Sequence, residues 1–207
     1  MAANLSKSLR KYFIMGSQNC DQDPCEVLRC AAAAGITAFQ FREKGAGSLI
    51  GNAKLELGKQ LREICHQYNI PFIVNDDVEM VDILEADGIH IGQDDPPADE
   101  LRKLFPEKII GLSISNDSEA DKSPISLVDY IGAGPVFATN TKTDAKSPVG
   151  LGWITSLKEQ YPDLPIVGIG GITTKNAASV IEAGADGVSV ISAITKAETI
   201  KNAVKRL

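Results

Sequence analysis

Short β-rich runs alternate with longer helical stretches from one end of this 207-residue sequence to the other. Such alternation is typical of βα units, whose strands pair into a parallel sheet. Eight such units in about 200 residues are the lower limit for a (β/α)8 barrel and leave little room for a second domain. We therefore predict one (β/α)8 TIM barrel domain over residues 1–207, with strands at Lys11–Gly16, Ile36–Glu43, Pro71–Asp76, Gly88–Gly92, Ile109–Ser115, Tyr130–Val136, Pro165–Ile172 and Gly187–Ala193.

Helical patterns fill the gaps between these strands. The clearest places Leu57, Leu61, Ile64, Cys65 and Tyr68 on one helix face. Other helices are predicted at Val78–Glu85, Ala98–Phe105, Trp153–Tyr161, Lys175–Ala183 and Glu198–Leu207, with a weak one at Glu119–Leu127 because Pro124 interrupts it. A doubly wound open sheet is the alternative, but no G-x-G-x-x-G follows the first strand and polar residues end many strands.

Composition limits the partners. A net charge of -6 without a Lys/Arg-rich block argues against nucleic-acid binding, so an anionic substrate must meet a local positive site. No apolar run reaches the length of a signal peptide or a membrane span, and we expect a cytoplasmic protein without membrane partners. The four cysteines and two histidines form no zinc-like spacing, which favours structural thiols. The sequence does not determine the oligomeric state, and a homo-oligomer is one of the options.

Cationic and polar residues end the second predicted strand, in the run Gln40-Phe41-Arg42-Glu43-Lys44. Side chains alternate along a strand, so Gln40, Arg42 and Lys44 should face one side, and Phe41 and Glu43 the other. If the first set faces the barrel opening, two cations and an amide meet a ligand there. A strand end held by salt bridges is an equally good interpretation of this run alone.

Acidic residues end the third and fourth predicted strands. Asp76 and Asp77 follow Asn75, and Asp94 and Asp95 follow Gln93. Asp77 is the expected N-cap of the next helix, whereas Asp76 has no such role. Carboxylates on neighbouring strand ends suit a shared Mg²⁺, although each pair alone also fits an ordinary cap or loop.

Two later segments suit phosphate. Hydroxyls and an ammonium follow the sixth strand in Thr139-Asn140-Thr141-Lys142. The glycine-rich run Gly168-Ile169-Gly170-Gly171-Ile172-Thr173 ends the seventh strand and opens a helix, which is a favourable anion site in barrels. His90, His66 and Trp153 are interpreted as structural or exposed residues without chemistry.

Taken in order, the motifs Q-F-R-E-K, V-N-D-D, G-I-H-I-G-Q, T-N-T-K, G-I-G-G-I-T and V-I-S-A closely resemble the thiamine-phosphate synthase family over nearly the whole chain. The resemblance implies a Mg²⁺-dependent transferase. Such an enzyme condenses 4-amino-2-methyl-5-(diphosphooxymethyl)pyrimidine with 4-methyl-5-(2-phosphooxyethyl)thiazole and releases pyrophosphate. The implied mechanism is dissociative and needs no protein nucleophile.

The resemblance also assigns roles to individual positions. It implies catalytic roles for Arg42, Lys44, Ser113 and Lys142. It places the pyrimidine diphosphate at Gln40, Phe41, Arg42, Glu43, Lys44, Asn75, Ser113 and Lys142, the thiazole phosphate at Thr139, Asn140, Thr141, Gly171, Ile191 and Ser192, and Mg²⁺ at Asp76 and Asp95. Two positions depart from the family pattern, since many relatives carry a histidine at Ser115 and a proline at Ala138.

Two other functions fit parts of this pattern. A thiazole tautomerase of the same superfamily would bind no diphosphate and is expected to need the histidine that Ser115 replaces. A non-catalytic barrel that senses a thiamine precursor would leave Asp76, Asp95 and Lys142 without a task.

Overall fold

The strands of the protein close into a parallel barrel. The computed structural model describes residues 2–139, 141 and 146–207, with side chains from residue 5 onward. Strand order follows the sequence from β1 to β8, and β8 pairs with β1. The strands are β1 (Lys11–Met15), β2 (Ala38–Phe41), β3 (Phe72–Asn75), β4 (Gly88–Ile91), β5 (Ile109–Ile114), β6 (Tyr130–Ala133), β7 (Ile166–Gly168) and β8 (Gly187–Val190). The predicted (β/α)8 barrel is therefore confirmed, and the open sheet is excluded.

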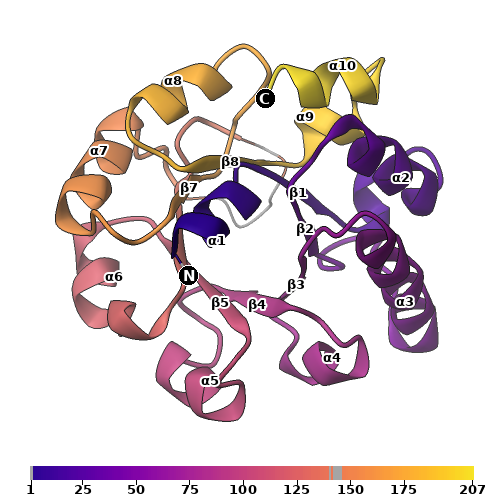
Figure 1. Ribbon diagram of the computed structural model, residues 1–207, viewed down its shortest axis with the longest axis horizontal. Helices are drawn as coiled ribbons and strands as arrows, with labels where there is room; N and C mark the ends of the chain where they lie inside the picture. Colours follow the sequence, from indigo (N-terminus) through magenta and orange to yellow (C-terminus); the bar gives the residue numbers. More distant parts are fainter. Residues whose placement is uncertain (1, 140, 142–145) are drawn as a thin grey trace.

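Helices form the outer ring, except for the first, which lies across the barrel axis (Figure 1). They are α1 (Ala2–Ser8), α2 (Pro24–Ala34), α3 (Gly51–Gln67), α4 (Val78–Ile83), α5 (Ala98–Leu104), α6 (Asp117–Lys122), α7 (Leu151–Gln160), α8 (Ala177–Glu182), α9 (Ser192–Thr195) and α10 (Ile200–Lys205). The weak segment predicted around Pro124 is split, because α6 ends before this proline and a 3-10 turn, Ile125–Leu127, follows it. No helix in the described part of the chain is long and apolar enough to cross a membrane.

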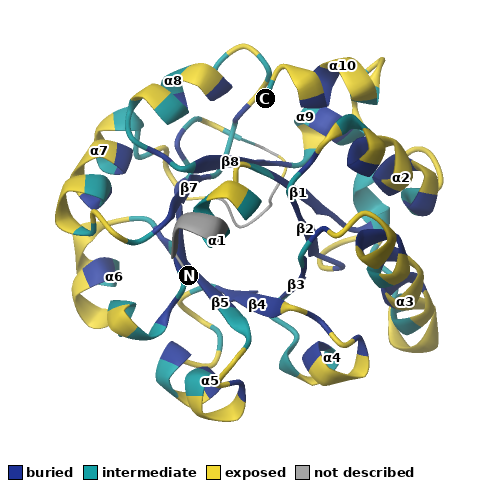
Figure 2. Ribbon diagram, in the orientation of Figure 1, coloured by how far each residue is buried: buried dark blue, intermediate teal, exposed yellow. Residues whose placement is uncertain are grey.

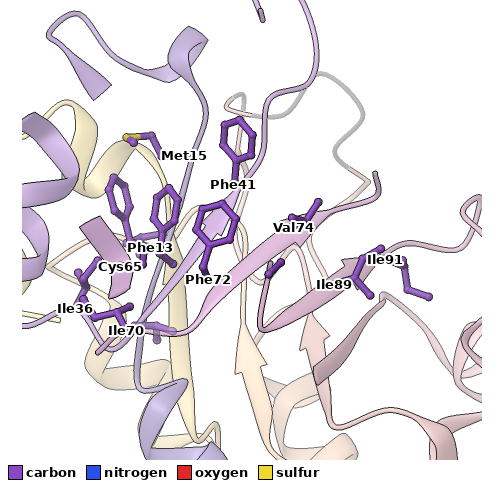
Figure 3. Packing of buried hydrophobic residues seen from close by; sticks show 14 of the residues in the cluster. Phe13, Met15, Ile36, Phe41, Cys65, Ile70, Phe72, Val74, Ile89 and Ile91 are labelled. Carbon is purple, nitrogen blue, oxygen red and sulfur yellow. The ribbon is translucent and has the colours of Figure 1, made fainter. Parts of the chain in front are cut away.

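Apolar side chains fill the space between the strands and the helices. The strands form a buried ring, and the helices expose their outer faces (Figure 2). Phe41 and Phe72 stack with ring centroids 6.1 Å apart (Figure 3). Phe13 and Phe39 meet edge to face, with ring centroids 5.7 Å apart. Since a fully buried Phe contributes about 1.5–3 kcal/mol, this aromatic group is a large part of the local stability.

A smaller apolar cluster occupies the barrel interior and is covered by α1. Tyr12, Ala38, Ile73, Tyr130 and Val167 are buried there together with Leu9, and Leu5 of α1 packs against them. The helix lies across the barrel axis in Figure 1. This covering helix was not predicted, because its sequence carries few apolar residues at helical spacing.

Neighbouring strands are joined in pairs at their amino ends by a repeated side-chain contact. The residue just before each even strand accepts a hydrogen bond from a backbone N–H at the start of the preceding odd strand. The pairs are Thr37 with Lys11 (2.8 Å), Asp87 with Phe72 (2.8 Å), Asp129 with Ile110 (2.8 Å) and Asp186 with Ile166 (2.9 Å). This end of the barrel is thereby fixed, and the opposite end is left to the loops that carry the candidate site.

Candidate active site at the carboxyl end of the barrel

Two adjoining cavities open where the strands end. The charged cavity, of about 220 Å³, is lined by Arg42, Lys44, Asn75, Asp76, Asp95 and Ser113 together with the loops around them. The glycine-rich cavity, of about 260 Å³, is lined by Thr139, Thr141, Gly170, Gly171, Ile191 and Ser192 with their neighbours. Thr139, Ile169 and Gly170 line both. Of the residues predicted for the two ligands, the charged cavity is lined by Arg42, Lys44, Asn75 and Ser113, and the glycine-rich cavity by Thr139, Thr141, Gly171, Ile191 and Ser192.

Opposite charges meet in the charged cavity. Lys44 forms an ion pair and a close hydrogen bond with Asp76, and this bond raises the pKa of the lysine. Burial alone would raise the pKa of Asp76, but Lys44 outweighs it and the pKa is lowered. The pKa of Asp95 is raised by burial and by Asp76, although its Oδ2 accepts a hydrogen bond from the backbone N–H of Gly92 at 2.7 Å. The two carboxylates therefore repel each other and would gain from a further cation.

The carboxylate pair fits Mg²⁺ better than a metal held by protein alone. Within the described residues, no three or more His, Cys, Asp or Glu side chains form a metal-binding group. Mg²⁺ is usually bound by one or two carboxylates plus water and substrate phosphates. Asp76 and Asp95 meet that requirement from neighbouring strand ends, and the pKa of Asp95 is raised first by burial and then by the nearby Asp76 charge.

The end of β2 divides its side chains as strand alternation predicts. Arg42 and Lys44 line the charged cavity, and Gln40 lies one layer deeper, only 1% exposed. The side chains of Phe41 and Glu43 do not line the cavity, although the family resemblance implied that both contact the pyrimidine diphosphate. Phe41 packs on Phe72 outside the barrel because odd and even positions face opposite sides.

Glu43 instead fixes two loops. Its carboxylate accepts hydrogen bonds from the backbone N–H and hydroxyl of Ser17, at 2.7 and 2.5 Å, and from the backbone N–H of Leu49 at 2.6 Å. These bonds join the loop after β1 to the loop after β2. Glu43 therefore supports the rim of the charged cavity from behind.

Asp76 and Asp77 differ as the sequence suggests, but not in every detail. Asp76 has a positive φ of 61°, a conformation that costs energy in a residue with a side chain and is frequent at functional sites. Asp77 stands at the N-cap of α4, yet its side chain makes no capping bond. It pairs with Lys54 at 2.6 Å instead.

The glycine-rich cavity is shaped by contact between the loops after β6 and β7. Gly171 has φ +64°, and a Cβ there would lie 2.6 Å from the carbonyl oxygen of Ala138, so only glycine fits. Asn176 accepts a hydrogen bond from the Thr173 backbone N–H at 2.7 Å and donates one to the Gly171 carbonyl at 3.1 Å. Asn140 and Lys142, also predicted here, lie outside the described residues.

Two contacts at the site were not predicted from the sequence. His90 was expected to be packed, and it is 6% exposed, but its Nε2 also lies 2.9 Å from the Ser113 hydroxyl. Lys146 lines the charged cavity and pairs with Glu119 at 2.6 Å, which outweighs burial and lowers the pKa of Glu119. For His90 and Ser113 the sequence signal is the inward phase of β4 and β5, whereas Lys146 lies in a loop and Glu119 in α6, where strand alternation gives no signal. Trp153 packs as expected and donates to the Ile114 carbonyl at 3.2 Å.

This fold and site define a class of protein: a (β/α)8 barrel whose strand ends suit phosphorylated small-molecule ligands. Residues 11–194 match the family model described as Thiamine monophosphate synthase. The chain belongs to this family.

Individual relatives agree with that membership. The chain is 65% identical over 199 residues to a thiamine-phosphate synthase of Oceanobacillus iheyensis, covering 96% of this chain and 97% of the relative. A solved thiamine phosphate pyrophosphorylase from Pyrococcus furiosus is 34% identical, with a TM-score of 0.87 over 99% of this chain and 96% of that one. A thiamine phosphate pyrophosphorylase from Bacteroides thetaiotaomicron, 11% identical with a TM-score of 0.64 over 94% of this chain and 93% of that one, shares the fold.

Proposed function

We propose that this protein is a thiamine-phosphate synthase. It would join 4-amino-2-methyl-5-(diphosphooxymethyl)pyrimidine to 4-methyl-5-(2-phosphooxyethyl)thiazole and release pyrophosphate. The observation that carries the proposal is the pair of adjoining cavities with the shared wall at Thr139, Ile169 and Gly170. A reaction that joins two phosphorylated ligands needs two anion sites that meet where the new bond forms.

Charge supports the assignment of the diphosphate to the charged cavity. Arg42, Lys44 and the predicted Lys142 supply three positive charges, and Asp76 and Asp95 remove two. A diphosphate ester carries about three negative charges near neutral pH. Bound Mg²⁺, held by Asp76 and Asp95, would supply the two missing positive charges and stabilise the leaving pyrophosphate.

The glycine-rich cavity is proposed for the thiazole phosphate. Gly170 and Gly171 let the backbone approach a phosphate closely, and Thr141 and Ser192 bring hydroxyls, with their oxygens 3.5 Å apart. Asn140, Ile191 and Thr139 complete the predicted set. This neutral, hydroxyl-rich environment suits a monophosphate better than a diphosphate.

The chemistry needs positioning rather than a protein nucleophile. Arg42 and Lys44 would hold the diphosphate while the bond between its oxygen and the pyrimidine methylene carbon breaks, leaving both electrons on oxygen. The pyrimidine amino group would stabilise the methylene cation, with Gln40, Asn75 and Ser113 orienting the ring. The thiazole nitrogen then donates its lone pair to that carbon, so the new C–N bond balances the lost C–O bond.

A direct assay tests the proposal. The purified protein, both substrates and Mg²⁺ should yield equal amounts of thiamine phosphate and pyrophosphate, and excess EDTA should abolish both products because the leaving charge is no longer offset. Activity that persists in EDTA would contradict the metal assignment. Conversion of a carboxythiazole phosphate without pyrophosphate release would favour a tautomerase, and binding without turnover a sensor.

A further inference from the structure

Five side chains form a continuous hydrogen-bonded chain across the barrel interior. Gln40 Nε2 donates to Tyr12 Oη at 2.9 Å, and Tyr12 Oη lies 2.9 Å from Tyr130 Oη. Tyr130 Oη lies 2.9 Å from His90 Nδ1, and His90 Nε2 lies 2.9 Å from Ser113 Oγ. Each residue belongs to a different strand, and the Ser113 end lines the charged cavity.

Two glycines make room in the barrel for this row of hydrogen-bonded side chains. A Cβ at Gly111 on β5 would lie 2.1 Å from Cζ of Tyr130, and one at Gly132 on β6 would lie 3.0 Å from Cε1 of His90. Glycine inside a strand weakens it, and it is found where another group approaches closely. The phenol and the imidazole therefore cross the barrel at positions where the strands carry no side chain.

The Gln40 amide nitrogen sets the direction of the hydrogens. With its Nε2 facing Tyr12, the amide can only donate there, so Tyr12 Oη accepts and gives its single hydrogen to Tyr130, while Gln40 Oε1 is buried without a hydrogen-bond partner among the described residues. Tyr130 accepts from Tyr12 and gives its own hydrogen to His90 Nδ1. Burial raises the pKa of both tyrosines, which keeps each phenol protonated.

This direction determines the tautomer of His90. Because Nδ1 accepts from Tyr130, the hydrogen of the neutral ring lies on Nε2 and is donated to Ser113 Oγ. Ser113 then has its own hydroxyl hydrogen left for a partner in the charged cavity. If His90 carried its hydrogen on Nδ1 instead, Ser113 would donate to the imidazole and could only accept from a ligand.

We propose that Tyr130 is a positioning residue: it fixes His90 in the Nε2–H tautomer and so turns the Ser113 hydroxyl hydrogen toward the ligand. The nature of that ligand, the pyrimidine diphosphate, rests on the proposed function. The tautomer does not. The two parts can therefore be tested separately.

Long-range ¹H–¹⁵N NMR of the imidazole nitrogens measures the tautomer directly. The chain has two histidines, and exposed His66 on α3 serves as the internal reference. In the wild type, we expect His90 with Nε2 protonated and Nδ1 unprotonated. Tyr130→Phe should raise the Nδ1–H population of His90 without changing His66. Tyr68→Phe, the same chemical change on an exposed residue, should change neither.

Kinetics test the consequence for Ser113. Tyr130→Phe should lower kcat/KM about tenfold, the effect of one lost positioned hydrogen bond. In a Ser113→Ala background it should have almost no further effect, because the hydroxyl that Tyr130 positions is gone. A merely structural role for Tyr130 would lower kcat/KM by the same factor in both backgrounds.

Two results would overturn the proposal: a wild-type His90 protonated on Nδ1, or a Tyr130→Phe variant with an unchanged His90 tautomer. The wild-type spectrum decides even if Tyr130→Phe fails to fold. A wild-type protein that shows the expected tautomer but releases no pyrophosphate would instead defeat the proposed function.

Discussion

Asp76 has a left-handed backbone conformation directly after β3, at the contact between Lys44 and Asp95. Such strain persists where the surroundings impose it, and here it brings a carboxylate beside the proposed diphosphate site. Its neighbour Asp77 carries the same group but pairs with Lys54 on α3. The two aspartates therefore provide a matched pair for mutation.

Asp76→Asn should lower kcat/KM about 10²-fold, because it removes a charge that would hold Mg²⁺ against the leaving group. Steady-state kinetics at several Mg²⁺ concentrations should also give a higher Mg²⁺ requirement. Asp77→Asn should stay within about threefold of the wild type, since its carboxylate pairs with Lys54 and does not line the charged cavity. Equal losses in both variants would mean that the site depends on loop structure and not on the Asp76 charge.

The direction of a side chain could be predicted where it depends on alternation along a single strand. Alternation along β2 separates Arg42 and Lys44 from Phe41 and Glu43, and this phase is readable from the sequence. The bond between His90 and Ser113 is not readable in this way. It depends on the register of β4 against β5, where His90 lies opposite Gly111, and on a tyrosine reaching across from β6.

At the level of elements, the positions of the strands were predicted correctly, but the predicted strands were longer than the observed ones. The Gly168–Thr173 run was assigned to one strand up to Ile172, but β7 ends at Gly168, because positive φ at Gly170 and Gly171 leads the chain into the loop. Helix α1 was missed altogether. Its role comes from covering the barrel interior, which is a property of the closed barrel and not of its own sequence.

The links between strand pairs predict a pH-dependent stability. Asp186 accepts hydrogen bonds from the backbone N–H of Ile166 and from Ser6 and Lys158, and despite opposing burial these bonds lower its pKa. A lowered pKa in the folded state stabilises the protein above the unfolded value, near 3.9, and this stabilisation is lost as pH falls through the folded value.

Asp186→Asn should therefore lower the free energy of unfolding by about 1–2 kcal/mol at pH 7, measured by urea denaturation. The difference from the wild type should be constant above about pH 5 and shrink below about pH 4, as the wild-type carboxylate becomes protonated. Exposed Asp163→Asn serves as the control and should show neither effect. A difference that grows on acidification would contradict the assigned role.

For the whole molecule, the overall charge opposes the ligand that the site is proposed to bind. A net charge of -6 repels pyrophosphate, so binding depends on the local cations and on a metal that offsets Asp76 and Asp95. Pyrophosphate with Mg²⁺ should therefore stabilise the fold, whereas either one alone should have a much smaller effect. This coupling arises because the metal and the diphosphate neutralise each other inside one cavity.

Thermal unfolding measures this coupling without turnover. At a ligand concentration about 100 times Kd, the stabilisation is about 2.7 kcal/mol, which corresponds to a rise in Tm of about 5 °C or more for a chain of this size. Asp76→Asn should lose most of the joint effect of Mg²⁺ and pyrophosphate, and Asp77→Asn should keep it. A full shift with pyrophosphate alone in EDTA would mean that the cations suffice, and that the carboxylate pair serves some purpose other than holding a metal.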